Sequence, residues 1–309
     1  MEQEALTSIA DLDKYLSKIE KIFSIDDLLT RNFTKDEIAN YYKLSSSGYK
    51  YFHSKDGAVH MALNYDGIYN EDGFYTQAKE VSALINENQY TSILELGCGK
   101  GFNSLFLSKH NPDLKFQGVD ITHKHLSIAK AKARGINNLT LSYGDFHELE
   151  FKASTFDLVF ELEAVCHATD NRKVLESVYK VLKPRGKFVL YEGFRQNGYE
   201  KLPNNLKNAS VLTEKSMSVN ESIEIDNWLK IASEVGFKLK SCDDISEAIM
   251  PNLTRFQQLA RGYYKYPLLS KLFLLVLPRA LVMNSIAGLL MPFTIKNQAQ
   301  GYYKIILQK

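Results

Sequence analysis

The sequence of 309 residues has little cysteine. Cys98, Cys166 and Cys242 lie far apart, without the paired spacing of a zinc site or the density of a disulfide framework. We therefore expect no metal site and a reducing compartment. Cys98 and Cys166 are interpreted as small packing residues and not as nucleophiles.

An excess of charge of one sign is also missing. The chain has 38 Lys and Arg against 36 Asp and Glu, for a net charge of +2. Proteins that bind nucleic acid usually carry a strongly basic face. The balance of charge therefore predicts no nucleic-acid partner.

The sequence contains no long uninterrupted hydrophobic run. Its most apolar region, residues 267–295, is interrupted by Lys271 and by Pro278 with Arg279, so it falls below the roughly 18 apolar residues of a spanning helix. The acidic and polar start MEQEALTSIADLDKYL predicts no signal peptide. We expect a cytoplasmic protein. The apolar region could make peripheral contact with a membrane, cover an apolar pocket, or pack on its own core.

The pattern along the chain predicts an α/β fold. From Tyr90, short β-rich runs alternate with helical ones, which is typical of a parallel sheet with helices on both faces. We divide the chain into four parts: a helical and aromatic-loop cap over 1–80, an α/β core over 81–244, an apolar helical cap over 245–298, and a final strand over 299–309.

The segment ILELGCGKG, residues 93–101, is the first strand-to-helix turn of that core. Ligands of open α/β sheets bind at the carboxyl ends of the strands, and glycines there let the backbone approach the ligand. Its spacing, Glu-x-Gly-x-Gly-x-Gly, differs from that of dinucleotide-binding turns and disfavours a nicotinamide oxidoreductase. Glu95 is suited to a cationic amine, such as the aminoacyl end of S-adenosylmethionine.

Two later strand ends extend this prediction. Asp120 follows about 20 residues after the glycines, where a carboxylate can accept hydrogen bonds from ribose hydroxyls. Asp145 and Phe146 end the third strand and suit the adenine. The alternatives are a purely structural glycine turn and a helix-capping role for Asp120.

Five segments resemble, in order, the class I S-adenosylmethionine-dependent methyltransferases: ILELGCGKG, GVDIT, GDF, FDLVFELEAVCHA and VLKPRGKFVLYE. The resemblance implies a Rossmann-like, seven-stranded sheet whose last strand, GYYKIILQ, is antiparallel. It also implies that S-adenosyl-L-methionine is bound by Glu95, Gly97, Gly99, Gly101, Asp120, Ile121, Asp145 and Phe146. Glu161 is interpreted either as a further cofactor contact or as a solvated carboxylate at a strand end.

The segment LEAVCHAT, residues 162–169, is similar to IEATCHAP of the sterol side-chain methyltransferases. Methylation of an alkene leaves a carbocation, which aromatic faces can stabilise and from which a base must remove a proton. Glu163 is our candidate base, with His167 next, although His167 could instead be a hydrogen-bonding residue at a helix start. Tyr49 and Tyr51 are candidates for the aromatic wall.

These features predict a methyltransferase that acts on a lipophilic small molecule, at carbon of a sterol-like or isoprenoid alkene. Three alternatives stay open: oxygen or nitrogen methylation of a natural product, quinone, phenol or amino alcohol; alkylation of an unsaturated fatty chain, as in cyclopropane synthases; and a non-catalytic module that binds the cofactor or a partner. Fold alone does not decide between them. The sequence also leaves open whether the chain forms a homo-oligomer.

Overall fold

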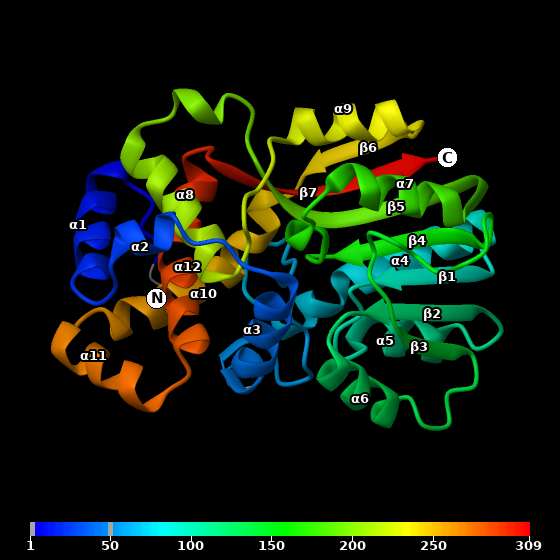
Figure 1. The fold of residues 1–309 in the computed structure, drawn as a ribbon, viewed down its shortest axis with the longest axis horizontal. Coiled ribbons are helices and arrows are strands. Elements are labelled where there is room, and N and C mark those ends of the chain that lie inside the picture. Colours follow the sequence, from blue (N-terminus) through cyan, green and yellow to red (C-terminus); the bar gives the residue numbers. More distant parts are fainter. Residues whose placement is uncertain (1–3, 49–51) are drawn as a thin grey trace.

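The computed structural model describes residues 4–48 and 52–309. Within these residues, strands form one seven-stranded sheet in the order β3-β2-β1-β4-β5-β7-β6 (Figure 1). Strands β1 to β5 are parallel, and β7 is antiparallel to both of its neighbours. This confirms the predicted sheet with its antiparallel last strand. The strands are β1 Ser92–Leu96, β2 Lys115–Asp120, β3 Leu139–Tyr143, β4 Phe156–Leu162, β5 Leu182–Arg195, β6 Lys238–Asp244 and β7 Gln300–Gln308.

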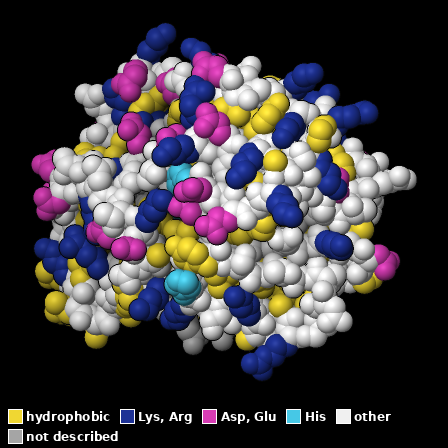
Figure 2. Space-filling view, turned by 45° about the vertical axis from the view of Figure 1, so that its right-hand side comes forward, with side chains coloured by type: hydrophobic (Ala, Val, Ile, Leu, Met, Phe, Trp, Pro, Cys, Tyr) yellow, Lys and Arg dark blue, Asp and Glu magenta, His cyan; other side chains and the backbone are white. Residues whose placement is uncertain are grey.

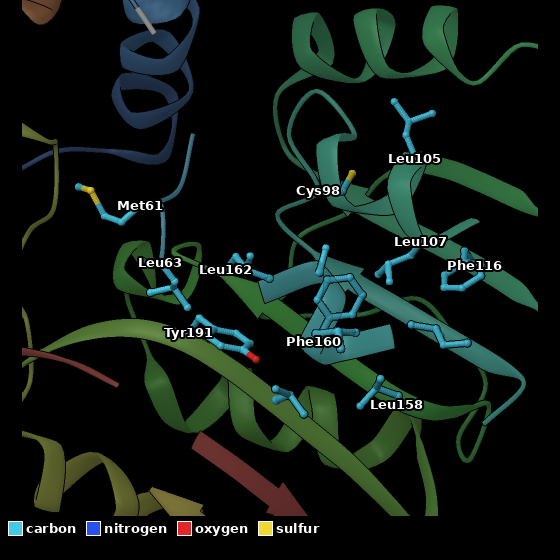
Figure 3. Close-up of a cluster of buried hydrophobic side chains, with 14 of the residues drawn as sticks. Met61, Leu63, Cys98, Leu105, Leu107, Phe116, Leu158, Phe160, Leu162 and Tyr191 are labelled. Carbon is cyan, nitrogen blue, oxygen red and sulfur yellow. The ribbon is translucent and has the colours of Figure 1, made fainter. Parts of the chain in front are cut away.

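Helices cover both faces of the sheet, as predicted, because successive strand residues point to opposite sides. Leu158 and Phe160 of β4 join one apolar cluster, while Val159 between them joins the other. Figure 3 shows the first cluster, in which Phe160 lies near Leu107. The first face carries α4 Thr76–Asn88, α5 Phe102–His110 and α6 His123–Lys132, and the second carries α7 Asn171–Val181 and α9 Ile225–Val235.

A helical cap lies beyond the carboxyl ends of the parallel strands (Figure 1). It contains a third apolar cluster, whose centre includes the fully buried Leu289 and Phe293 of α12. Its members are α1 Ile9–Glu20, α2 Ile25–Leu29, α8 Asn204–Ser216, α10 Ser246–Tyr263, α11 Pro267–Val276 and α12 Arg279–Lys296. The apolar region 267–295 therefore has two structural roles. Helix α12 is core, whereas α11 lies on the outside.

Helix α3, Lys35–Gly48, connects the cap to the sheet domain. It contacts α12 on one side, and the ring of its Tyr42 lies 6.0 Å from that of His125 in α6 on the other. In Figure 1 it lies between the two halves of the molecule. Helix α3 therefore borders the crevice in which open α/β sheets bind their ligands.

Figure 2 shows how charge is distributed on one face of the described part of the chain. Lys and Arg side chains are spread among acidic and neutral ones on that face, without gathering in a stripe. Hydrophobic side chains gather near its middle. The even spread agrees with the balanced composition and differs from the basic face typical of nucleic-acid binders.

Candidate active site

The glycine turn after β1 is shaped by three left-handed residues. Gly97, Gly99 and Gly101 have φ angles of 62°, 51° and 78°, which side-chain-bearing residues rarely adopt. At Gly97 a Cβ atom would also lie 2.4 Å from the Cβ of Ala164. The glycine thus permits close contact between this turn and the segment that follows β4. That contact places the predicted cofactor turn beside the predicted acceptor site.

Glu95 is buried behind this turn. Its carboxylate accepts hydrogen bonds from Nδ2 of Asn103, at 3.2 Å, and from Oγ of Ser104, both in the first turn of α5. Burial raises the pKa of Glu95 to about 7, although these bonds oppose the shift. Glu95 therefore attaches the glycine turn to α5, an arrangement that the spacing alone did not reveal.

Asp120 lies against the same turn. Its Oδ2 accepts a hydrogen bond from the backbone N–H of Gly99 at 2.8 Å, and its Oδ1 accepts one from Thr122 at 2.6 Å. Each carboxylate oxygen can accept two bonds, so both keep capacity for ribose hydroxyls. Ile121 is half-buried between Asp120 and Thr122. The structure thus brings together the glycine turn and the strand-end carboxylate that the sequence proposed as one site.

Asp145 and Phe146 lie after β3, beside α3. Partial burial acts to raise the pKa of Asp145, but hydrogen bonds from Lys35 and His147 outweigh it and lower the pKa to about 2. The ring of Phe146 lies 4.8 Å from that of His147, and its side chain is partly buried. The ion pair between Lys35 and Asp145 holds the start of α3 over the predicted adenine end.

Glu161 and Glu163 have different surroundings because β4 ends at Leu162. Glu161 is fully buried, and its Oε2 accepts hydrogen bonds from the backbone N–H groups of Ala164 and Val165 at 2.8 and 3.2 Å. Its Oε1 has no partner among the residues that the structure describes. Burial, reinforced by the nearby Glu192, raises its pKa well above the usual value. Glu161 is therefore neither solvated nor on the same strand face as Glu163.

Glu163 adopts a left-handed conformation with φ of 53°. Such a conformation costs on the order of 1–3 kcal/mol in a residue with a side chain and is concentrated at functional sites. It turns the carboxylate toward Met61, whose N–H donates to Oε1 at 2.6 Å, and Tyr302, whose hydroxyl donates at 2.8 Å. Burial raises the pKa of Glu163 to about 8. Both bonds end on Oε1, and Glu163 lines the adjoining cavity.

Glu192 is a further buried carboxylate, which the sequence reasoning did not single out. It follows Tyr191, the last β5 residue that pairs with β4, and accepts hydrogen bonds from the N–H groups of Cys166 at 2.8 Å and Gly193 at 2.7 Å. Burial raises its pKa to about 7. Its signal was available, because Glu192 lies late in the β-rich run GKFVLYEGF, and the ends of neighbouring parallel strands converge. Tyr302 had none, since it lies 139 residues from Glu163.

His167 lies in the short 3-10 helix Val165–His167. Its Nε2 shares a hydrogen bond of 2.7 Å with the hydroxyl of Tyr42 from α3. Burial lowers its pKa to about 4, so the imidazole is neutral near pH 7. Tyr49 and Tyr51, the proposed aromatic wall, lie outside the described residues. Tyr41 and Tyr42 instead contribute aromatic surface at this site.

A cavity of about 440 Å³ connects these groups with the cap. Glu163, His167 and Glu192 line one end, at the strand ends. The remaining wall is mainly apolar and aromatic and comes from α3, the segment before α4, α10 to α12 and the start of β7. It includes Tyr41, Tyr42, Phe52, Met61, Ile249, Phe256, Tyr263, Phe273, Leu277, Leu281, Val282, Met291 and Tyr302. Its volume lies in the range typical of small-molecule sites.

The residues around the glycine turn fit S-adenosylmethionine. Three side-chain-free positions leave room for close backbone approach, and Asp120 has spare acceptor capacity. Glu95, Gly97, Gly99 and Asp120 would hold the methionine and ribose parts. The buried carboxylates Glu161, Glu163 and Glu192 lie next to them, around the segment that touches Gly97.

Comparison with known proteins finds methyltransferases among the relatives of this chain. A family model described as "Methyltransferase domain" matches residues 87–236. The S-adenosyl-L-methionine-dependent Diels-Alderase iccD of Talaromyces variabilis is 31% identical over 173 residues, covering 53% of this chain and 59% of that protein. The sterol 24-C-methyltransferase ERG6 of Saccharomyces cerevisiae is 28% identical over 165 residues, covering 50% of this chain and 41% of that enzyme.

The chain spans about half the length of the curated relatives it matches. Among solved structures, a geranyl diphosphate methyltransferase in complex with GPP and sinefungin has a TM-score of 0.66 to this chain at 13% sequence identity. The match covers 88% of this chain and 97% of that one. At this identity the likeness concerns the fold.

Proposed function

Because residues 87–236 form a class I S-adenosylmethionine-dependent methyltransferase domain, we propose that the chain transfers a methyl group to a lipophilic small molecule, at carbon of a sterol-like or isoprenoid alkene. The observation that carries this proposal is the cavity of about 440 Å³. It begins at buried carboxylates beside the glycine turn and continues between apolar helices of the cap. Such a cavity suits an apolar body with its reacting atom at the polar end.

The cofactor supplies an electrophilic methyl group on a positively charged sulfur. The chain holds the acceptor in the cavity, with its reacting carbon facing the glycine turn. Positioning of this kind can contribute about 7–11 kcal/mol to lowering the barrier in favourable cases. The apolar wall also excludes water from the acceptor, and it includes the rings of Tyr41, Tyr42 and Tyr302.

Transfer to an alkene would form a bond from the methyl group to one alkene carbon, break the bond from the methyl group to sulfur, and release neutral S-adenosylhomocysteine. The positive charge would then lie on the other alkene carbon. Aromatic faces stabilise such a cation by about 2 kcal/mol or more when the site is dry. Glu163 and Glu192 lie at the same end of the cavity, and each would add negative charge there once a nearby cation favours its ionised form. Loss of a proton from a neighbouring carbon then regenerates an alkene.

Glu163 is the proposed acceptor of that proton, through Oε2. Its pKa of about 8 lies close to neutrality, where a general base is most effective. Tyr302 and the N–H of Met61 orient the carboxylate through Oε1. A positively charged ligand in the cavity would favour the ionised form. His167, which is neutral near pH 7, is proposed to position Tyr42 and to act as a second acceptor.

The names of the relatives support a lipophilic acceptor without identifying it. The yeast relative acts on a sterol, and the structural neighbour binds a geranyl diphosphate. An oxygen or nitrogen acceptor is the alternative, since the same carboxylate could remove its proton. The Diels-Alderase relative raises a second candidate, cyclisation of a polyene in the same apolar cavity. That reaction would use the cavity and no methyl transfer.

The test uses S-adenosylmethionine with a trideuterated methyl group and separate pools of sterols, prenyl diphosphates, phenols and amines. Mass spectrometry then locates the label. Label on carbon of an alkene-bearing lipid would support the proposal. Label on oxygen or nitrogen would replace the acceptor and keep the methyl transfer. An unlabelled, cyclised product would instead favour the cyclase.

A further inference from the structure

Helix α11, Pro267–Val276, leaves an apolar surface in contact with solvent. Leu268 and Leu275 are each 83% exposed and Val276 is 78% exposed, while Ser270 is the buried residue of the helix. Leu269 and Leu272 are about half exposed. A contiguous apolar surface of this kind generally indicates a binding surface for a protein or a membrane.

The exposed helix lies at the edge of the acceptor cavity. Phe273 of α11, Leu277 after it and Leu281 of α12 line that cavity. The same short segment therefore presents leucines to the outside and other apolar side chains to the cavity. An apolar molecule outside α11 could reach the cavity along a continuous apolar path.

The chain around α11 is basic. The sequence from residue 248 to residue 309 contains no Asp or Glu, whereas Lys265, Lys271 and Arg279 lie within three residues of α11 or inside it. Lys265 also lines a hollow between α1 and α10 with Lys14, Lys18 and Arg261. In Figure 1, α1 and α11 lie at the same end of the molecule. This end combines exposed leucines with clustered cations.

We propose that α11 docks the protein on a bilayer that contains anionic lipid. The leucines enter the interface, and the cations of α1, α10 and α11 lie at the headgroup level. Ten residues of helix span about 15 Å, half of the hydrocarbon thickness, and no helix in the described part of the chain is long and apolar enough to cross a membrane. The helix therefore lies in the interface, as amphipathic anchors do.

Docking in this orientation brings the edge of the cavity to the lipid phase. The acceptor then enters from the membrane without passing through water. This route rests on the proposed function, whereas the docking itself does not. A second copy of the chain is the competing occupant of the same face.

The test is flotation with phosphatidylcholine vesicles, with and without phosphatidylglycerol. The variant carries Leu268→Glu with Leu275→Glu, neither of which lines the cavity. The matched control is Leu239→Glu, a half-exposed leucine on the edge strand β6. The wild type and the control should float with the anionic vesicles, more weakly as salt rises. The double variant should lose about tenfold or more of its vesicle partition.

A charge variant, Lys265→Gln with Lys271→Gln, should bind anionic vesicles more weakly and with less salt dependence. All variants should keep wild-type affinity for S-adenosylmethionine in calorimetry, which shows that they fold. Equal flotation of the wild type and the leucine variant would overturn the proposal. The proposal would also be overturned if the wild type did not float and light scattering showed a dimer of the wild type but not of the leucine variant.

Turnover separates this proposal from the proposed function. The leucine variant should match the wild type on an acceptor dispersed in detergent and fall behind on one embedded in vesicles. A wild type that floats yet methylates none of the acceptor pools would keep the docking and reject the proposed function. A wild type that methylates dispersed acceptor without binding vesicles would keep the proposed function and reject the docking.

Discussion

Replacing Glu163 with Gln tests the assignment of the proton acceptor most directly. Glutamine keeps the size of the side chain, and its carbonyl oxygen can accept the hydrogen bonds that Met61 and Tyr302 now donate to Oε1. It cannot take up a proton. If Glu163 is the base, turnover of the variant should fall about 10²–10⁴-fold. Its affinity for S-adenosylmethionine should stay within about twofold of the wild type, a change in binding free energy well below about 1.4 kcal/mol.

The pKa of Glu163 also predicts the effect of pH on stability. Burial raises this pKa from 4.5 to about 8, so the folded state prefers the protonated form. The stabilising contribution is fully present below about pH 4.5 and is lost as pH rises through about 8. At about 1.4 kcal/mol per pH unit, the loss amounts to at most about 3 kcal/mol by pH 7 and about 5 kcal/mol above pH 8.

The assay is urea unfolding of the wild type and Glu163→Gln at a series of pH values from about 4 to 9. The free energy of unfolding of the wild type should fall relative to that of the variant as pH rises. The control is Glu247→Gln, an exposed carboxylate that pairs with Lys296 and should change the stability by less than about 1 kcal/mol.

Two results would refute this reasoning. Full turnover by Glu163→Gln would exclude the residue as base and transfer the role to His167 or Glu192. Parallel stability curves for the wild type and the variant would show that Glu163 ionises normally in the folded protein. In that case the neighbours Glu161 and Glu192 would have to account for any alkaline loss of stability.

Four further predictions concern the cofactor turn and the acceptor site. Gly97→Ala should abolish cofactor binding and lower the melting temperature, because the φ of Gly97 is 62° and the added Cβ would meet Ala164 at 2.4 Å. Cofactor binding in calorimetry together with an unchanged melting temperature would contradict the close contact. Asp120→Ala should weaken binding of S-adenosylmethionine at least about tenfold, and unchanged affinity in calorimetry would reject the ribose role. His167→Gln should leave the pH–rate profile unchanged near pH 6.5, because the pKa of His167 is already about 4. Tyr42→Phe removes the hydroxyl that hydrogen-bonds to His167, and steady-state kinetics should show a larger change in KM than in kcat.

Local sequence predicted the sheet and brought out the residues of the proposed cofactor half of the site. The alternation of β-rich and helical runs predicted the parallel strands, because such patterns follow from backbone geometry over a few residues. The antiparallel direction of the last strand, GYYKIILQ, came from the resemblance to the class I methyltransferases. The glycine turn and Asp120 could also be recognised locally. In a parallel sheet, strand ends converge at one edge, so Gly99 and Asp120 meet although 21 residues separate them.

Tertiary structure alone decided the surroundings of each carboxylate. Glu161 and Glu163 look equivalent in the sequence, but the strand ends between them, and one meets backbone N–H groups while the other meets Met61 and Tyr302. The pKa of each group depends on burial and on partners that come from distant parts of the chain. The same holds for the apolar region 267–295, which divides into buried α12 and exposed α11. Hydrophobic composition indicates that the side chains of this region favour an apolar environment. Only the packing of the whole chain determines that those of α12 are buried and those of α11 are exposed.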